Sequence, residues 1–199
     1  MLKTDADNDN SYNGFNWAFF IKNSLQSLGL YEIWINQDIC VPNINLIKQR
    51  IYDNFLQSWN SSVNESQKLC TFNLFKNEIS FEKYLDVIKE TSLSNILSRF
   101  RLSSHSLCIE TGRYKNVPKN MRLCKCCNMK VVENEYHFLL VCPLYADIRK
   151  RYFANYFCHW PNMFKFKSLI KSQNCKTLYN LSKYIKNAMK LRADVADNL

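Results

Sequence analysis

Three cysteines and one histidine in the second half of the chain have the residue types and spacing of a metal site. Two residues separate Cys124 from Cys127, nine residues follow before His137, and four more precede Cys142. Thiolate sulfur and imidazole nitrogen are ligands that Zn²⁺ prefers, and four of them complete a tetrahedral structural site. This metal quartet leaves no coordination position for water or a substrate. It therefore predicts a metal that stabilises structure, in a protein that binds rather than catalyses.

The metal-site interpretation has alternatives in the same residues. Four unrelated buried side chains would give the same pattern, because cysteine is often an interior residue. Cys126 lies beside Cys127 and could replace it as a ligand. We favour Cys127, because a two-residue gap lets both sulfurs of a knuckle converge on one ion. Pro143 fits the first position of a helix, which would place Cys142 at a helix N-terminus, where unpaired N–H groups favour a thiolate.

Positive charge is concentrated around and after the metal quartet. Residues 1–110 have 10 Lys and Arg against 12 Asp and Glu, residues 111–151 have 9 against 3, and residues 152–199 have 8 against 2. The net charges are therefore −2, +6 and +6 within a total of +10. This distribution is typical of a surface that binds a polyanion, and a solvated basic face that keeps the protein soluble is the alternative. The candidate nucleic-acid contacts, in which the tyrosine would stack on a base, are Arg113, Tyr114, Lys115, Lys119, Arg122, Lys125 and Lys130.

Residues that would support catalysis are missing or badly placed. Two-metal phosphoryl chemistry needs paired carboxylates, and residues 84–87 offer only Asp86. Cys158 and His159 are neighbours in sequence, but consecutive side chains of a helix diverge, so they do not form a nucleophile and its base. The chain has three glycines, and it contains neither the P-loop motif nor the glycine motif of dinucleotide-binding proteins. We therefore predict that the protein is not an enzyme.

The composition favours a helical, intracellular protein. Hydrophobic residues make up 47% of the 199 residues, whereas three Gly and four Pro are few for the turns of an all-β fold. The nine cysteines are an odd number, and residues 1–7 lack the apolar region of a signal peptide. The thiols are therefore expected in a reducing compartment, the cytoplasm or the nucleus. No stretch approaches the roughly 18 apolar residues of a membrane span.

Apolar periodicity predicts helices along most of the chain. Gly29 should end the first of them, the polar residues 60–62 should end the third, and Ser92 is a candidate N-cap. Residues 68–81 fit either a helix or a strand, and 31–35 could be an apolar plug instead of a helix. The helices are expected at about 17–28, 31–35, 42–59, 81–88, 92–100, 144–157, 162–171 and 176–191. The four tryptophans, which are expected to pack in the core rather than to stack on bases, are Trp17, Trp34, Trp59 and Trp160.

A longer pattern surrounds the metal quartet. Residues 101–114 read Arg-Leu-Ser-Ser-His-Ser-Leu-Cys-Ile-Glu-Thr-Gly-Arg-Tyr, and residues 133–145 read Glu-Asn-Glu-Tyr-His-Phe-Leu-Leu-Val-Cys-Pro-Leu-Tyr, followed by Arg149. With the Cys-x2-Cys pair between them, residues 99–152 closely resemble the zinc-binding region found C-terminal to the reverse transcriptase of LINE-type (non-LTR) retrotransposons. Weaker likeness extends to both sides, so that nearly the whole chain resembles the terminal segment of such an element.

The resemblance implies Zn²⁺ at the metal quartet, in a module that holds template RNA or target DNA while a polymerase copies RNA. The palm with its carboxylates and an endonuclease domain have no counterpart in this sequence, so neither activity is carried over. The chain is expected to be a truncated or remnant open reading frame of such an element. In the pattern, Gly112 could supply a left-handed turn. Arg113 could contact a phosphate or form a salt bridge to acidic residues of the zinc-binding finger, the segment that carries the metal quartet.

The expected fold is mainly α, a helical array with a small zinc-knuckle-like element before the C-terminal helices. Its parts are a disordered tail at 1–12, a helical region at 13–100, a zinc-binding module at 101–157 and helices at 158–199 that pack on the module. The leading prediction is a zinc-stabilised module that binds the phosphate backbone of RNA or DNA. One alternative is a protein–protein docking or scaffold module, whose partner is a reverse transcriptase domain or a second copy of the chain. A non-functional element remnant is the other alternative, and no membrane is expected as a partner.

Overall fold

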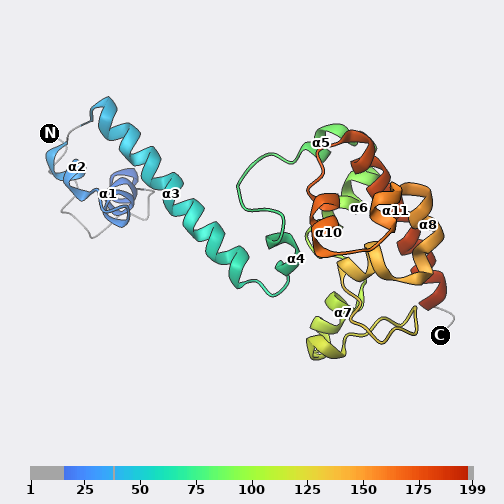
Figure 1. Cartoon of the computed structure of the whole chain (residues 1–199). Helices are drawn as coiled ribbons and strands as arrows, with labels where there is room; N and C mark the ends of the chain where they lie inside the picture. The colour runs from blue at the N-terminus through green and yellow to red at the C-terminus, as the bar shows by residue number, and fades with distance from the viewer. Residues whose placement is uncertain (1–15, 38, 197–199) are drawn as a thin grey trace. The chain divides into compact units, whose positions relative to one another are not determined.

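The computed structural model describes residues 16–37 and 39–196, so the tail predicted at 1–12 lies outside the described residues. The chain is mainly α-helical, as predicted, and divides after Ser62 into two compact units (Figure 1). The predicted boundaries near residues 100 and 157 both lie inside the second unit. Among the described helices, none combines the length and the apolar character that crossing a membrane requires.

The first unit begins with α1 (Trp17–Ser27) and α2 (Tyr31–Asn36). The Asn16 side chain accepts hydrogen bonds from the first N–H groups of α1 and caps that helix. Gly29, with φ at +70°, ends it as predicted. The N–H groups of Gly29 and Leu30 donate to the carbonyls of Gln26 and Leu25 at 3.0 and 2.8 Å. These two bonds form a Schellman motif, which requires a left-handed residue where this glycine stands.

The long helix α3 (Val41–Glu65) corrects a predicted boundary. We expected it to end at residues 60–62, but the helix continues through them to Glu65. Asn and Ser lower helix stability by only about 0.5 kcal/mol each relative to Ala. No Gly or Pro stands at 60–65 to interrupt the helix. Polar composition alone is therefore a weak stop signal.

Apolar side chains of the first unit are poorly covered. Among its described residues, only Leu25 has the burial of a core residue, with 7% of its surface exposed. Trp17 is 55% exposed and Phe55 is 56% exposed, although the periodicity predicts both as core. The stripes on these helices are amphipathic, but the unit supplies too little opposing surface to bury them.

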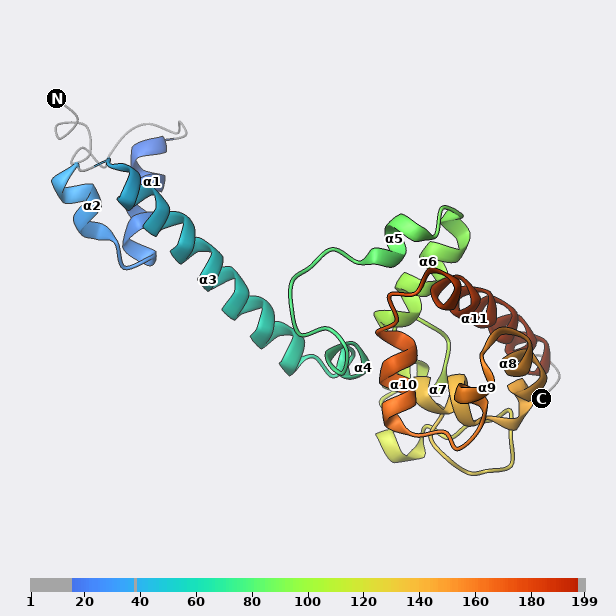
Figure 2. The ribbon, with the colours of Figure 1, turned by 45° about the horizontal axis from the view of Figure 1, so that its top comes forward.

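Four helices of the second unit, α6 (Thr91–Arg101), α8 (Ala146–Tyr152), α10 (Met163–Ile170) and α11 (Cys175–Ala196), surround a core to which the turns at 137–145 also contribute buried side chains. Helix α11 packs against α6 and α8, and Figure 2 shows α11 beside α6. One face of α11 is almost wholly buried at the helical spacing predicted from the sequence. Its buried apolar residues are Leu178, Leu181, Tyr184, Ile185 and Ala188.

Short elements connect these helices and position the metal quartet. They are α4 (Cys70–Asn73), α5 (Lys83–Val87), α7 (Cys108–Tyr114) and α9 (Asn155–Cys158), with 3₁₀ turns at Lys119–Met121 and Pro143–Tyr145 and a π-helical turn at His137–Val141. Residues 68–81 therefore contain one short helix and no strand. Helix α7 was not predicted, and the single helix expected at 144–157 is interrupted at Phe153, where the backbone is extended.

Two local expectations for the second unit are wrong. Glu90 occupies the N-cap of α6, and the expected cap Ser92 lies inside the helix, where its hydroxyl donates to the Glu90 carboxylate at 2.5 Å. Trp160 is 88% exposed instead of packing in the core. It follows α9 with a φ of +47°, between the helices that were expected at 144–157 and 162–171. The indole thus stands outside the helical stripes on which the core prediction relied.

Candidate metal centre

A short hairpin-like loop positions the first two cysteines of the metal quartet. Leu123 and Val132 form an antiparallel bridge. The Cys124 N–H donates to the Val131 carbonyl at 2.8 Å, and the Glu133 N–H donates to the Arg122 carbonyl at 3.0 Å. These bonds hold the two arms of the loop together. Cys124 and Cys127 therefore sit on a knuckle whose ends are fixed by backbone pairing.

The π-helical turn brings the other two residues of the quartet together. The Cys142 N–H donates to the His137 carbonyl at 2.8 Å, which closes a turn between residues five apart. An ordinary α-helical turn pairs residues four apart and would rotate these two side chains away from each other. The Asn134 side chain accepts from the His137 N–H at 2.8 Å and caps the start of this segment. Cys142 precedes the 3₁₀ turn that Pro143 begins, as the sequence indicated.

The four side chains converge on one point. Their ligand atoms all lie within 4.8 Å of one another, and the sulfur of Cys127 is 3.4 Å from His137 Nε2. Cys124, His137 and Cys142 are buried, and Cys127 is half-buried. None of the nine cysteines, all of which the structure describes, forms a disulfide. This cluster has the donors and the spacing to hold a metal ion, which confirms the predicted grouping.

Without a cation, two thiols of the cluster are held in the neutral form and one ring nitrogen has no partner among the described residues. The hydrogen bond to Cys142, together with burial, raises the pKa of the Cys124 thiol to about 12. Burial raises the pKa of Cys127 as well. His137 Nδ1 is buried and has no hydrogen-bond partner within the described part of the chain. Without a cation, three thiols and an imidazole are packed together with little to satisfy them.

The structure also favours Cys127 over Cys126 as the candidate metal ligand. Ligand atoms of Cys124, Cys126 and Glu133 form a second group within 4.8 Å of one another. The Glu133 carboxylate already accepts two hydrogen bonds from Arg192, both 2.7 Å long, and one of 2.7 Å from the Cys108 N–H. Because its oxygens are engaged there, this group is a poorer metal site than the quartet. Cys127 is the cysteine that lies with His137.

The buried side chains of Arg149 and Tyr184 support the π-helical turn. Arg149, 6% exposed, donates to the carbonyls of Leu139 and Cys142 at 2.8 and 2.9 Å. The Tyr184 hydroxyl donates to the Phe138 carbonyl at 2.7 Å. The end of a helical turn leaves carbonyls without backbone partners, and these two side chains satisfy them. Neither role was predicted from the sequence.

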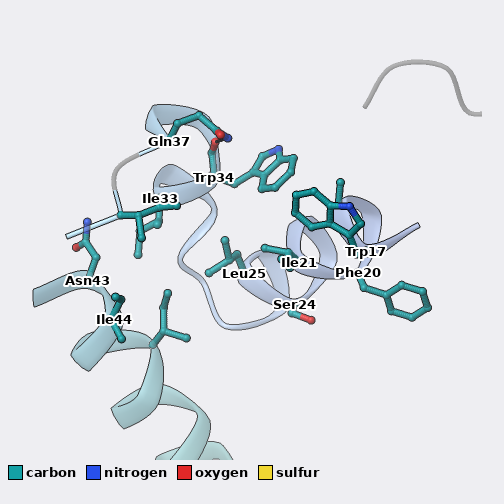
Figure 3. A pocket seen from close by; sticks show the side chains of 13 residues that line it. Trp17, Phe20, Ile21, Ser24, Leu25, Ile33, Trp34, Gln37, Asn43 and Ile44 are labelled. Atoms are coloured by element: carbon teal, nitrogen blue, oxygen red, sulfur yellow. Dashed lines mark hydrogen bonds between the residues drawn. The ribbon is translucent and has the colours of Figure 1, made fainter. Parts of the chain in front are cut away.

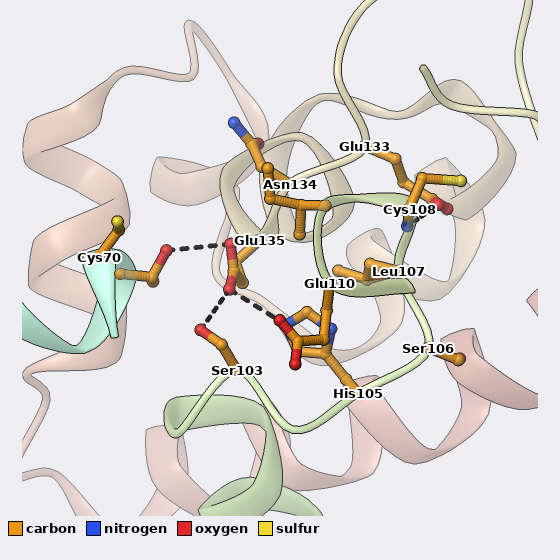
Figure 4. A network of polar contacts seen from close by, with 12 residues as sticks. Cys70, Ser103, His105, Ser106, Leu107, Cys108, Glu110, Glu133, Asn134 and Glu135 are labelled. Atoms are coloured by element: carbon orange, nitrogen blue, oxygen red, sulfur yellow. Dashed lines mark hydrogen bonds and ion pairs between the residues drawn. The ribbon is translucent and has the colours of Figure 1, made fainter. Parts of the chain in front are cut away.

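The buried carboxylate of Glu135 connects the segment between the knuckle and the π-helical turn with the loop after α6. Glu135 accepts hydrogen bonds from Ser103 at 2.7 Å and from Thr71 at 2.9 Å, and its carboxylate lies 3.1 Å from His105 Nε2 (Figure 4). Burial acts to raise the pKa of Glu135, but the contacts with His105 and Ser103 more than offset it, and the net shift is downward. Glu135 therefore stays ionised in the interior and joins three separate segments.

Gly112 and Arg113 have structural roles that differ in part from the expected ones. Gly112 lies inside α7 and does not form a left-handed turn, since Gly29 is the glycine with positive φ among those described. A Cβ at Gly112 would lie 2.7 Å from the Arg122 side chain, so the glycine allows that close approach. Arg113 pairs with Glu110 at 2.8 Å, within α7 rather than with acidic residues of the finger.

The structure places the candidate nucleic-acid contacts in two groups. Arg113 and Arg122 are half-buried, and Arg122 donates to the carbonyls of Val117 and Ile109 at 2.8 and 2.7 Å, which engages it in the scaffold. The exposed members, around the knuckle and the end of α7, are Tyr114, Lys115, Lys119, Lys125 and Lys130. The Arg113 guanidinium lies over the Tyr114 ring, 4.3 Å from its centre. Four lysines and one tyrosine are thus presented to solvent.

Comparison with protein families, with curated proteins and with solved structures finds no match to this chain. What the site can do must therefore be argued from its own residues. A closed set of four soft and borderline donors can bind a metal ion tightly and hold a loop in place.

Proposed function

We propose that the protein is a zinc-stabilised module that binds nucleic acid. The observation that carries the proposal is the convergence of three sulfurs and one imidazole nitrogen within 4.8 Å, beside a loop that presents exposed lysines. The resemblance of residues 99–152 to the zinc-binding region of LINE-type reverse transcriptases supports the same reading. The proposal assigns the metal a structural role and the lysines the contact with phosphate.

The donor set suits zinc better than other common metals. Thiolate and imidazole ligands in a four-membered set are typical of structural Zn²⁺, whereas Mg²⁺ and Ca²⁺ take oxygen ligands. Three thiolates around Zn²⁺ leave a net charge of −1. Arg149 donates to the carbonyl of the ligand Cys142 and supplies a buried positive charge next to the site. Bound zinc would hold the knuckle and the π-helical turn together.

The exposed lysines around the knuckle would bind phosphate with little sequence preference. Each lysine that neutralises a phosphate releases counterions, so log K falls with log salt by about 0.9 per contact. Replacing Lys115, Lys119, Lys125 and Lys130 by Gln should therefore lower the salt slope by up to about 4. Fluorescence anisotropy with labelled RNA and DNA strands at several salt concentrations measures this slope.

The matched control removes four exposed lysines far from the knuckle in sequence: Lys150, Lys167, Lys171 and Lys176. The control variant has the same net charge and should keep most of the salt slope. Equal loss of binding in both variants would show that only overall charge matters. Absence of salt-dependent binding to any strand would contradict the proposed function.

A second candidate function, protein docking, is favoured by the first unit. An apolar cavity of about 420 Å³ there is lined by residues of α1, α2 and α3, including Trp17, Phe20, Ile33 and Ile44 (Figure 3). Leu25 is the one described residue of this unit with core-like burial. Contiguous exposed apolar surface is typical of interaction sites. Its partner would be a second copy of the chain or a polymerase domain.

Replacing Phe20 and Phe55 by Ser tests the docking function, since both rings are about half exposed and contribute little to the unit's own core. Light scattering coupled to gel filtration should show self-association of the parent chain and its loss in the variant. A parent chain that is monomeric at high micromolar concentration would exclude a second copy as the partner.

A further inference from the structure

A groove between α6 and α11 combines apolar and cationic groups away from the metal quartet. It has a volume of about 240 Å³. Its apolar lining comes from Ile96 and Phe100 of α6 and from Ile185 and Met189 of α11. Arg99, Lys186, Ser104 and Ser106 also line it. Both helices belong to the second unit and pack against each other, so the groove is part of one rigid core.

The cations of this groove are available to a ligand. The Arg99 side chain has no hydrogen bond or ion pair with the residues that the structure describes. Lys186 lies 3.5 Å from Glu90, and both side chains are about half exposed, at 51% and 47%. An exposed pair of this kind contributes little to stability. A phosphate could therefore replace Glu90 as the partner of Lys186 at little cost.

Helix α11 extends the positive charge along one line. Tyr179, Lys183, Lys186 and Lys190 are spaced by four, three and four residues, which places them on one face of the helix. Tyr179, Lys186 and Lys190 are exposed, and the Lys183 ammonium lies over the Tyr179 ring, 4.5 Å from its centre. The opposite face of the helix forms the core. The charged face of α11 therefore extends beyond the groove on both sides, with Lys183 before Lys186 and Lys190 after it.

His105 contributes an unused polar atom at the same place. Its side chain is 4% exposed and lines the groove. Nε2 lies 3.1 Å from the Glu135 carboxylate, while Nδ1 is buried and has no partner in the described structure. A buried polar atom without a partner costs free energy. A ligand that brought a hydrogen-bonding group to this nitrogen would recover that cost.

We propose that the α6–α11 groove binds a nucleotide of a single-stranded nucleic acid. The base enters the apolar part of the groove, and the neighbouring phosphates contact Arg99 and Lys186, with Lys183 and Lys190 further along α11. Single-strand-binding surfaces combine a basic track with apolar or aromatic platforms for the bases in this way. A duplex keeps its bases stacked and would use only the lysines. The inference rests on the proposed function and adds a contact surface separate from the knuckle lysines.

A strand without bases provides the direct test. A labelled strand of ten thymidines, a strand of ten uridines and an abasic strand with the same number of phosphates are titrated into the full chain by anisotropy. We expect the abasic strand to bind on the order of tenfold more weakly, because it has no base to place against the apolar lining of the groove. Equal binding of the abasic and thymidine strands overturns the groove proposal and leaves phosphate binding intact. Binding of none of the strands at low salt contradicts the proposed function itself.

Two variants test whether the higher affinity for a strand with bases than for an abasic strand depends on this groove. Ser106→Phe adds bulk at an exposed residue that lines the groove, and Ser168→Phe is the control on the exposed side of α10. Ser106→Phe should bring the thymidine-to-abasic affinity ratio close to one while the control keeps it. Retention of the full ratio in Ser106→Phe, with an unchanged thermal melt, would overturn the proposal. Photocrosslinking of a 4-thiothymidine strand, mapped by mass spectrometry, should label residues 96–106 or 185–190, and labels confined to other segments would count against it.

The charge contribution is tested by replacing Arg99 and Lys186 with Gln. The matched control replaces two exposed lysines, Lys167 of α10 and Lys171 directly after it, with Gln. We expect the groove variant to lose several-fold more affinity for the thymidine strand than the control loses. Equal losses in the two variants would mean that the groove has no special role.

Discussion

Single side chains explain why the stretch from 99 to 152 has its particular polar residues. Ser103 and His105 contact the buried carboxylate of Glu135, and Arg192 contacts that of Glu133. Arg149 satisfies carbonyls of the π-helical turn. These residues lie around the metal quartet and fix the segments that present it. Several polar residues of this stretch therefore hold the segments that carry the metal quartet.

Cys126 and Cys127 are adjacent in sequence, and the structure favours Cys127 as the metal ligand. Cys127→Ser should lose the bound metal, because Cys127 lies with His137, while Cys126→Ser should keep about one zinc per chain. Metal content of the purified variants, measured by inductively coupled plasma mass spectrometry, gives the result. The reverse outcome, metal kept without Cys127 and lost without Cys126, would mean that Cys126 is the ligand.

The ion pair between Glu110 and Arg113 predicts a pH dependence of stability. The hydrogen bonds from Arg113 lower the pKa of Glu110 in the folded protein. The folded pKa then lies below the unfolded value of about 4.3, so the pair stabilises the protein above that pH and the contribution is lost as pH falls through the folded pKa. Urea denaturation of Glu110→Gln and of the parent chain should show a difference in the free energy of unfolding that shrinks from pH 7 to pH 3. A difference that is independent of pH would contradict this assignment.

At the scale of elements, the π-helical turn depends on Arg149. Arg149→Met leaves two buried carbonyls without their donor, which should cost on the order of 2–4 kcal/mol. For a unit of this size that corresponds to a melting temperature lower by roughly 7–14 °C. Lys150→Met, at the exposed neighbouring position, is the control and should melt like the parent chain. Equal melting of Arg149→Met and its control would show that the turn does not need this side chain.

Sequence periodicity predicted most of the helices because their apolar faces are long and regular. The stripe at Leu178, Leu181 and Ile185 is an example, and all three side chains are buried. The predicted boundaries failed where tertiary contacts override local preference. Helix α7 has only seven residues, and its Gly112 is there because Arg122 packs against it. Short apolar periodicity cannot reveal such a contact.

The metal quartet could be predicted from residue type and spacing alone, but its support could not. The π-helical turn that pairs Cys142 with His137 has no sequence signature comparable to a helix cap. Glu135, Ser103 and Thr71 are up to 64 positions apart, so their contact is invisible to local reasoning. Spacing thus identifies ligands, whereas the supporting hydrogen bonds depend on the fold.

At the scale of the whole molecule, the two units differ in how far each buries its own apolar surface. The second unit has a continuous core that includes the candidate ligands Cys124 and Cys142. The first unit has a single described residue with core-like burial. Periodicity reports that a helix face is apolar and cannot report whether the chain supplies a surface to cover it. This limit explains why Trp17 and Phe55 were predicted as core and are exposed.

Metal removal should act on the second unit as a whole, because the ligands are part of its core. A structural zinc contributes binding free energy directly to folding, so a chelator should lower the melting temperature by more than 10 °C, with about 10 kcal/mol available from the site. Circular dichroism melts before and after chelation, followed by zinc addition, measure the effect. Restoration by Zn²⁺ and not by Mg²⁺ is expected. Identical melts with and without chelator would argue against a structural metal.

X-ray absorption spectroscopy at the zinc edge of the purified full chain reports the metal and its ligand atoms together. We expect about one zinc per chain, surrounded by three sulfur atoms at about 2.3 Å and one nitrogen atom at about 2.0 Å. A protein that purifies without zinc and does not take it up when its thiols are reduced would contradict the account, as would a bound zinc whose nearest neighbours are oxygen atoms.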